Sequence, residues 1–256
     1  MAESILDHPL LASRYLFPRS APLEKPFFVT AADGVSRLGC YQASPHKGAP
    51  TIVHFHGNGE VVADYVPDMV DLITSLGANV VFAEYRGYGA STGTPTVGAL
   101  LDDAEAVSEA LDEPVERVVV FGRSVGSIPA IELVGRHPRI GGLILDSGIA
   151  DPLERLRMRV APEELGVSPK AFTAAVSSRM DHQSKLGRYP GPMLVLHAVH
   201  DTLVPSSHAE RNVSWGAGPT QDKRLVLFPR GNHNTIFLAN SDEYLAHLGT
   251  FIDRLR

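Results

Sequence analysis

Residues 118–126, Val-Val-Val-Phe-Gly-Arg-Ser-Val-Gly, decide the fold of this chain. The stretch is a run of β-branched and aromatic residues that ends in Gly-x-Ser-x-Gly, and a helical pattern covers 128–134 directly afterwards. This order predicts a strand, a sharp turn with Ser124 at its apex and a helix, which is the layout of a nucleophile elbow. The apex residue of such a turn is strained, and flanking glycines let the strand and the helix approach closely. The stretch therefore predicts a nucleophilic serine on an α/β sheet.

Composition sets the size and the class of the protein. The chain has 256 residues, of which 44% are hydrophobic, so residues 1–256 can form one α/β domain whose core needs no metal or disulfide. The formal net charge of −6 comes without a basic stripe, which argues against nucleic acid as a partner. The composition leaves the oligomeric state open.

Localisation is predicted from three features of the sequence. No apolar run approaches the ~20 residues that a membrane-spanning helix needs, so we expect no transmembrane segment. The first residues lack the basic region and the apolar core of a signal peptide. Cys40 is the only cysteine and excludes an intrachain disulfide, which is typical of a reducing compartment. We expect a cytoplasmic protein.

Short apolar runs alternate with helical patterns along the chain. A hairpin at 27–41, with its turn at Asp33-Gly34, precedes them. The alternation predicts a mostly parallel central sheet with helices on both faces. In the helix at 97–111, we expect Asp102, Asp103 and Glu105 on the solvated side. The other predicted strands are 51–56, 79–84, 118–123, 142–146, 193–197 and 224–228, and the other helices are 62–76, 128–134 and 241–255.

The interval between Asp146 and Met193 is too long for a simple connection. Residues 149–184 have helix-like spacing, and loops at the carboxyl ends of parallel strands are where such sheets bind ligands. We therefore predict a small helical cap insertion over the site, the alternative being a surface excursion without substrate contact. Three arginines in it could attract an anionic substrate or form a solvated face: Arg155, Arg157 and Arg159.

A serine hydroxyl is a weak nucleophile and needs a base, usually histidine, oriented by a carboxylate. On sheets of this kind the partners follow in the order Ser, Asp or Glu, His. Asp201 follows the strand at 193–197, and His233 follows the strand at 224–228. Because parallel strands end at the same edge of the sheet, we predict that Ser124, Asp201 and His233 meet there. Asp146, which also ends a strand, is the alternative acid.

Acyl transfer also needs donors for the oxyanion of its transition state. One is predicted to be the backbone amide of Val125, directly after the nucleophile. The other is the backbone amide of Asn58, in the glycine-rich turn His56-Gly57-Asn58-Gly59 after an early strand.

Histidine pairs offer a metal site as an alternative. His54 and His56 share a strand face, and His197 and His200 lie close in sequence, but no acidic or cysteine partners cluster near either pair. We therefore predict no metal and no cofactor. Cys40 lacks a glycine elbow and is expected to be an inert thiol of the core or an edge.

Five segments together resemble the α/β-hydrolase superfamily over nearly the whole chain. The His-Gly-Asn and Tyr-Arg-Gly-Tyr-Gly segments further resemble the branch with bud-emergence-type proteins and protein depalmitoylases. The resemblance implies a catalytic triad of Ser124, Asp201 and His233, with Asn58 and Val125 in the oxyanion hole. Ala198 departs from the His-Gly-x-x-Asp pattern but leaves the acid in register. The five segments are 54–59, 84–93, 122–127, 196–205 and 231–234.

These features predict a serine hydrolase that cleaves small-molecule carboxylic esters or thioesters through an acyl-enzyme on Ser124. Two alternatives remain open. The same residues could cleave an amide or a peptide, or the fold could serve a non-catalytic ligand-binding protein.

Overall fold

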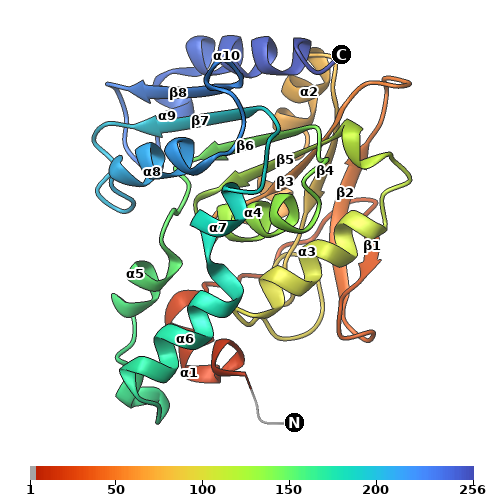
Figure 1. The fold of residues 1–256 in the computed structure, drawn as a ribbon. Coiled ribbons are helices and arrows are strands. Elements are labelled where there is room, and N and C mark those ends of the chain that lie inside the picture. The colour runs from red at the N-terminus through yellow and green to blue at the C-terminus, as the bar shows by residue number, and fades with distance from the viewer. Residues whose placement is uncertain (1–3) are drawn as a thin grey trace.

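Continuous apolar runs form the central strands, since β-branched and aromatic residues suit a sheet that is buried on both faces. The computed structural model describes residues 4–256 and has an eight-stranded sheet in the order β1-β2-β4-β3-β5-β6-β7-β8 (Figure 1). β1 and β2 form the predicted antiparallel hairpin, β2 is antiparallel to β4, and the other neighbours pair in parallel. The strands are β1 (Phe27–Thr30), β2 (Arg37–Ala43), β3 (Thr51–Phe55), β4 (Asn79–Ala83), β5 (Val118–Arg123), β6 (Gly142–Asp146), β7 (Met193–Ala198) and β8 (Lys223–Phe228).

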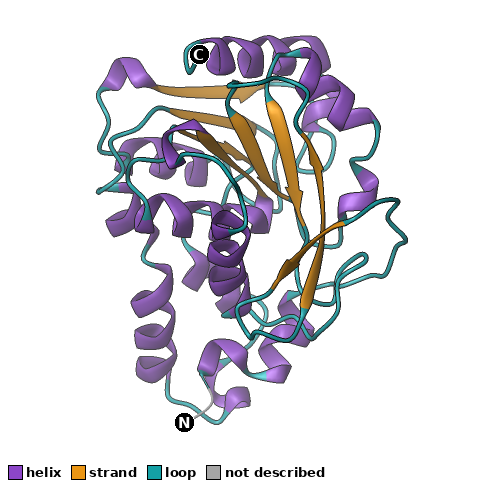
Figure 2. Ribbon diagram, turned by 90° about the vertical axis from the view of Figure 1, so that its right-hand side faces the viewer, coloured by secondary structure: helices purple, strands orange, loops and turns teal. Residues whose placement is uncertain are grey.

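Helices cover both faces of the sheet (Figure 2). On one face, Ile73 and Leu248 belong to a buried cluster that joins two helices to the strands. On the other face, Leu101 and Ile131 belong to a larger cluster. This arrangement confirms the predicted α/β fold. The first face carries α2 (Asp68–Ser75) and α10 (Ser241–Asp253), with the short α9 (Ile236–Ala239), and the second carries α3 (Ala99–Glu109), α4 (Ser127–Arg136), α7 (His182–Leu186) and α8 (Ser207–Trp215).

Two sequence predictions on these helices are wrong. The helix expected at 62–76 is instead a 3-10 turn, η2 (Val62–Asp64), followed by α2, because Pro67 lacks the N–H that a helix interior needs. Asp103 is buried rather than solvated, and it accepts hydrogen bonds from Nε and Nη2 of Arg86, both at 2.6 Å. A buried carboxylate needs such a partner, and sequence position alone does not show it.

The predicted cap, residues 149–184, connects β6 to β7 outside the sheet. It contains α5 (Pro152–Arg157), the 3-10 turn η5 (Pro162–Leu165), α6 (Pro169–Met180) and the start of α7. α6 contacts the N-terminal turn η1 (Ile5–Asp7), and α1 (Pro9–Tyr15) lies beside it (Figure 1). Two segments far apart in sequence therefore form one helical layer at this end of the molecule.

None of the helices within residues 4–256 is both long enough and apolar enough to cross a lipid bilayer.

Candidate active site

The turn after β5 has the geometry of a nucleophile elbow. Ser124 has a φ of 52°, in the left-handed region that non-glycine residues rarely occupy. The neighbouring glycines are required sterically, since a Cβ on Gly122 would lie 2.6 Å from the carbonyl oxygen of Gly126, and a Cβ on Gly126 would lie 2.1 Å from that of Phe55. Close packing of the turn between two strands therefore fixes where the Ser124 hydroxyl points.

Three loops bring the predicted serine, histidine and acid together. The Ser124 hydroxyl lies 2.8 Å from Nε2 of His233, and Nδ1 of His233 lies 2.7 Å from Oδ2 of Asp201. All three side chains are almost fully buried. His233 can therefore accept the proton of Ser124 at one ring nitrogen while Asp201 fixes the tautomer at the other.

The alternative acid, Asp146, makes no hydrogen bond with His233, whose Nδ1 faces Asp201 instead. Its Oδ1 accepts a hydrogen bond from the Ser147 hydroxyl and its Oδ2 one from the Tyr244 hydroxyl, both at 2.8 Å. The carboxylate is thus occupied by two donors at the end of β6.

Hydrogen bonds hold Asp201 in place and keep it ionised. Its Oδ1 accepts the backbone amides of Leu203 at 2.9 Å and Val204 at 2.8 Å. His197 donates from Nε2 to the Val204 carbonyl at 2.8 Å, and the same nitrogen makes a longer contact of 3.4 Å with Oδ2 of Asp201. Burial alone would raise the pKa of Asp201, but hydrogen bonding from His197 and His233 outweighs burial and holds this pKa below its ordinary value. The sequence pattern indicates His197 only as a possible metal ligand and gives no sign of this supporting role.

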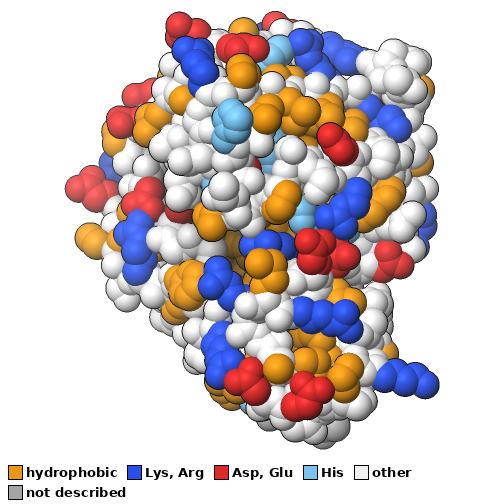
Figure 3. All heavy atoms as spheres, turned by 90° about the vertical axis from the view of Figure 1, so that its left-hand side faces the viewer, with side chains coloured by type: hydrophobic (Ala, Val, Ile, Leu, Met, Phe, Trp, Pro, Cys, Tyr) orange, Lys and Arg blue, Asp and Glu red, His pale blue; other side chains and the backbone are white. Residues whose placement is uncertain are grey.

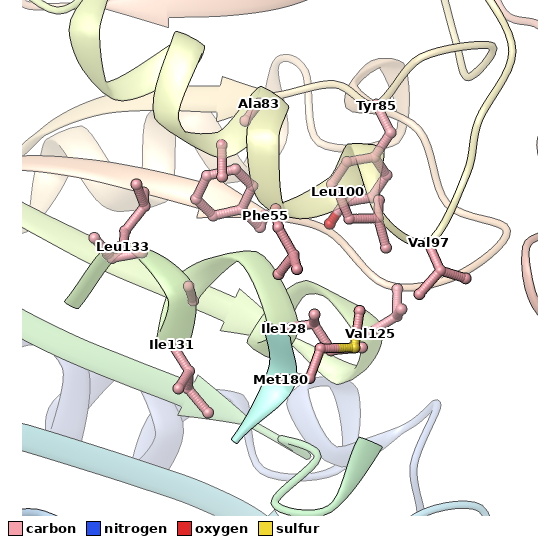
Figure 4. Close-up of a cluster of buried hydrophobic side chains, with 14 of the residues drawn as sticks. Phe55, Ala83, Tyr85, Val97, Leu100, Val125, Ile128, Ile131, Leu133 and Met180 are labelled. Atoms are coloured by element: carbon pink, nitrogen blue, oxygen red, sulfur yellow. The ribbon is translucent and has the colours of Figure 1, made fainter. Parts of the chain in front are cut away.

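The two predicted oxyanion donors line the same cavity as Ser124. Within residues 4–256, the backbone amides of Asn58 and Val125 have no hydrogen-bond acceptor, so both are free to donate to a ligand. The Val125 side chain is anchored in the hydrophobic cluster beside Ile128 and Val97 (Figure 4). Packing of this side chain therefore restrains the amide next to the nucleophile.

The loop around Asn58 is restrained through the Asn58 side chain. Its Oδ1 accepts hydrogen bonds from the Phe17 amide at 2.9 Å and the Tyr88 hydroxyl at 3.0 Å, and its Nδ2 donates to the Tyr15 carbonyl. Tyr15 and Phe17 also line the cavity. The N-terminal segment is therefore part of the site, which the sequence did not predict.

Glu84 restrains the same loop through His56. Its Oε1 accepts from Nε2 of His56 at 2.6 Å, while Nδ1 of His56 lies 2.8 Å from the Gly57 carbonyl. Burial alone would lower the pKa of His56, but the Glu84 carboxylate raises it above its ordinary value. Both ring nitrogens of His56 face oxygen atoms, and the hydrogen bond to Glu84 links the loop to the end of β4.

Arg123 links the three functional loops. This side chain, from the second position of Gly-x-Ser-x-Gly, forms an ion pair with Glu60 and donates from Nη2 to the His233 carbonyl at 3.2 Å. Glu60 in turn accepts the Gly57 amide at 2.7 Å. A Cβ on Gly57 would lie 2.4 Å from Nη1 of Arg123, so glycine leaves room for the ion pair. The elbow, the Asn58 loop and the His233 loop are thus held in one arrangement.

The cavity at Ser124 has a volume of about 150 Å³ and is rich in positive charge. Arg123, Arg155 and Arg159 line it, and no Asp or Glu of residues 4–256 does. Figure 3 shows the face of the molecule at the carboxyl ends of the strands, where Lys and Arg side chains lie beside a hollow that hydrophobic side chains also border.

A second cavity, of about 170 Å³, shares Arg123 and Asn234 with the first. Its lining is mainly apolar, from α2, α9 and α10, and includes His54 and Asp146. His54 packs against Phe121, and burial lowers its pKa well below the ordinary value. This histidine is therefore neutral and part of an aromatic cluster.

The residues considered as metal ligands have other surroundings. His54 and His56 have the separate partners described above, and His200 is exposed whereas His197 is buried. Across residues 4–256, no group of His, Cys, Asp and Glu side chains has a metal-binding arrangement. Cys40 is fully buried, and burial raises its pKa to about 12, as befits an inert thiol.

Comparison with known proteins extends these observations. Residues 46–162 match a family model described as serine aminopeptidase, S33. The chain is 30% identical over 238 residues to the uncharacterized protein YfhR of Escherichia coli, covering 87% of this chain and 78% of YfhR. It is 27% identical to protein bem46 of Schizosaccharomyces pombe over 216 residues, which cover 82% of this chain and 70% of bem46.

Solved structures support the fold. A Pyrococcus furiosus esterase, Pf2001, superposes with a TM-score of 0.71 at 17% identity, covering 93% of this chain and 98% of the esterase. The mouse α/β hydrolase domain-containing protein 10 gives a TM-score of 0.69 at 18% identity, with 91% and 100% covered. Together with the family model, YfhR and bem46, the elbow and the sheet order show that the chain belongs to the α/β-hydrolase superfamily, as a hydrolase of the bem46-like type.

Proposed function

We propose that this protein is a serine hydrolase of small-molecule carboxylic esters or thioesters, with Ser124, His233 and Asp201 as its catalytic triad. The contacts of 2.8 Å from Ser124 to His233 and 2.7 Å from His233 to Asp201, at the wall of a cavity, carry the proposal. A hydroxyl, a base and an orienting carboxylate in this order are the groups that acyl transfer requires.

In the first half-reaction, the Ser124 oxygen attacks the carbonyl carbon of the substrate while Nε2 of His233 takes the hydroxyl proton. Negative charge moves to the carbonyl oxygen, and the amides of Asn58 and Val125 are available to stabilise it. The tetrahedral adduct collapses when His233 passes its proton to the leaving alcohol or thiol. The acyl group is then an ester of Ser124.

In the second half-reaction, water attacks the acyl-enzyme and gives one proton to His233. Collapse of the second adduct returns that proton to the Ser124 oxygen and releases the carboxylic acid. Asp201 stabilises the imidazolium in both halves. This chemistry needs no cofactor or metal. We propose the cytoplasm as its location, since the only cysteine forms no intrachain disulfide.

We also propose that residues 149–184 act as a cap, because Ile149, Arg155 and Arg159 line the cavity with Ser124. The charge of the same lining favours ester substrates over the amide alternative. An aminopeptidase binds a substrate with a free α-ammonium group, which the arginines of this cavity would repel. No carboxylate of residues 4–256 lines the cavity to balance that charge. We therefore favour esters and thioesters over N-terminal peptides.

Hydrolysis of p-nitrophenyl esters from acetate to palmitate tests the proposal, with wild type and Ser124→Ala side by side. Amino-acid p-nitroanilides serve as the amide arm. We expect release of p-nitrophenol by the wild type only, and slower or no release from the anilides. Equal rates for wild type and Ser124→Ala would reject the proposal. Anilide hydrolysis faster than ester hydrolysis would favour the peptidase alternative.

A further inference from the structure

Two cap arginines face the cavity, and the arginine between them does not. Arg155 is in the last turn of α5, and Arg159 lies in the turn that directly follows this helix, where its amide donates to the Leu156 carbonyl at 3.0 Å. Both line the cavity with Ser124 and His233. Arg157 does not line the cavity and donates to the Thr173 hydroxyl at 2.7 Å. The structure thus separates three arginines that look equivalent in the sequence.

Neither cavity arginine is neutralised by a carboxylate from residues 4–256. Arg155 donates to the Met158 sulfur at 3.1 Å, and the Arg159 guanidinium lies 5.9 Å from the centre of the Phe17 ring. Other arginines on or beside the cap do have acidic partners: Arg179 pairs with Asp102, Arg211 with Glu154, and Arg14 with Glu164. The cavity arginine Arg123 is paired with Glu60. Among the described residues Arg157 also lacks an acidic partner, but of the three only Arg155 and Arg159 carry their unpaired charge to the cavity of the nucleophile.

A guanidinium binds carboxylate or phosphate through two parallel hydrogen bonds, and it does so best where water is partly excluded. Arg155 is half-buried against the cavity wall. Arg159 is exposed but also lines the cavity. The two positive charges, with no carboxylate of residues 4–256 in the lining, raise the local concentration of an anionic substrate. The same charge disfavours a substrate that carries an ammonium group.

We propose that Arg155 and Arg159 bind an anionic group of the substrate, so that the enzyme prefers esters that carry a carboxylate or a phosphate. This inference rests on the hydrolase function proposed above and names its substrate class. The anion could belong to the acyl part or to the alcohol part of the ester, and the two arms of the test distinguish these sources.

The acyl arm compares p-nitrophenyl hydrogen adipate with neutral p-nitrophenyl hexanoate. The alcohol arm compares 4-acetoxybenzoate with its neutral methyl ester. We expect the wild type to have a kcat/KM at least tenfold higher for the anionic member of one arm. Arg155→Gln and Arg159→Gln should each reduce this ratio about tenfold, and raised salt should reduce it in the wild type.

Arg157→Gln is the matched control, because it removes the same charge from the same segment without touching the cavity. Its ratio should equal that of the wild type. A ratio at or below one in both arms, or an equal fall in all three variants, would overturn the anion site. Ser124-dependent hydrolysis of the neutral esters would then still support the proposed function.

Binding gives a readout that does not depend on turnover. Isothermal titration of adipate and 4-acetoxybenzoate into Ser124→Ala should detect at least one of them. The additional Arg155→Gln or Arg159→Gln change should weaken that binding at least fivefold, and Arg157→Gln should not. Failure of Ser124→Ala to bind either anion would reject this inference even if no ester were hydrolysed.

Discussion

Two serines in this protein share the same unusual backbone angle φ but have different surroundings. Ser124 follows β5, Ser147 follows the neighbouring β6, and both have a φ of 52°. The Ser124 hydroxyl meets His233 at a cavity wall, whereas the fully buried Ser147 hydroxyl donates to Asp146. A strained turn at the carboxyl end of a strand is therefore not enough for a nucleophile. A base on one side and open space on the other make the difference.

The two cavities likewise differ in the chemistry of their lining rather than in their volume. They are similar in volume and share Arg123 and Asn234. The larger cavity is mainly apolar, and its acid, Asp146, is engaged by two hydroxyls. The smaller has Ser124, His233 and two arginines without acidic partners among the described residues. The chemistry of the lining, rather than its size, distinguishes the site.

The largest expected effect is the difference in kcat between the two serine-to-alanine variants. Ser124→Ala should lower kcat by about 10⁵-fold, because it removes the group that forms the acyl-enzyme. Ser147→Ala should keep kcat within about tenfold but lower the free energy of unfolding by about 1–2 kcal/mol, since Asp146 loses a buried donor. Ester hydrolysis and urea unfolding measure the two effects. A larger loss of kcat in Ser147→Ala than in Ser124→Ala would reverse the assignment.

Replacement of the two aspartates should also lower kcat to different extents. Asp201→Asn should lower kcat by about 10³- to 10⁴-fold, because an amide favours the wrong tautomer of His233. Asp146→Asn should lower kcat far less, since Asp146 contacts Ser147 and Tyr244 instead. Steady-state kinetics checks both, with circular dichroism to verify folding. Comparable losses in two folded variants would make Asp146 the orienting acid.

The free energy of unfolding should depend on pH through the buried His182. His182 is fully buried, and burial lowers its pKa to about 3. Its ordinary value is about 6.5, so below that pH the unfolded chain binds a proton that the folded protein excludes. Its stabilising contribution is complete above pH 6.5 and falls as the pH approaches 3. About 2 kcal/mol should be lost between pH 7.5 and 5.

The variant His182→Gln tests this, because glutamine can still donate to the Ile149 carbonyl that His182 contacts. Its free energy of unfolding, from urea denaturation, should change less between the two pH values than that of the wild type. Identical pH dependence of the two proteins would show that another group is responsible.

The smallest effect is expected for Arg123, which lines both cavities. Arg123→Gln should lower kcat by about tenfold and change KM little, because its ion pair with Glu60 and its bond to the His233 carbonyl position three loops. Glu60→Gln should act similarly, and the double variant should not lose the product of the two factors. Full additivity in the double variant would mean that the two side chains act independently.

Much of the fold was predictable because each apolar run marks a strand and each strand end marks a loop at one edge. The positions of Ser124, Asp201 and His233 follow from that rule, and the structure brings their side chains within hydrogen-bond distance. Pro67, which ends the 3-10 turn region and precedes α2, is also visible in the sequence and explains why the helix predicted at 62–76 is interrupted.

The remaining features depend on contacts that no periodic pattern records. Asn58 holds the Phe17 amide across 41 residues, and Asp103 is buried because Arg86 reaches it. In the same way, the sequence does not indicate which of Arg155, Arg157 and Arg159 line the cavity. Packing between segments that are distant in sequence determines these contacts.

The most direct test of the central claim is to locate the nucleophile chemically. The wild type would be treated with a fluorophosphonate probe, and the modified peptide identified by mass spectrometry, with Ser124→Ala and Ser147→Ala in parallel. We predict one adduct on Ser124 in the wild type and in Ser147→Ala, and none in Ser124→Ala. An adduct that persists in folded Ser124→Ala, or a folded wild type that does not react, would contradict the account.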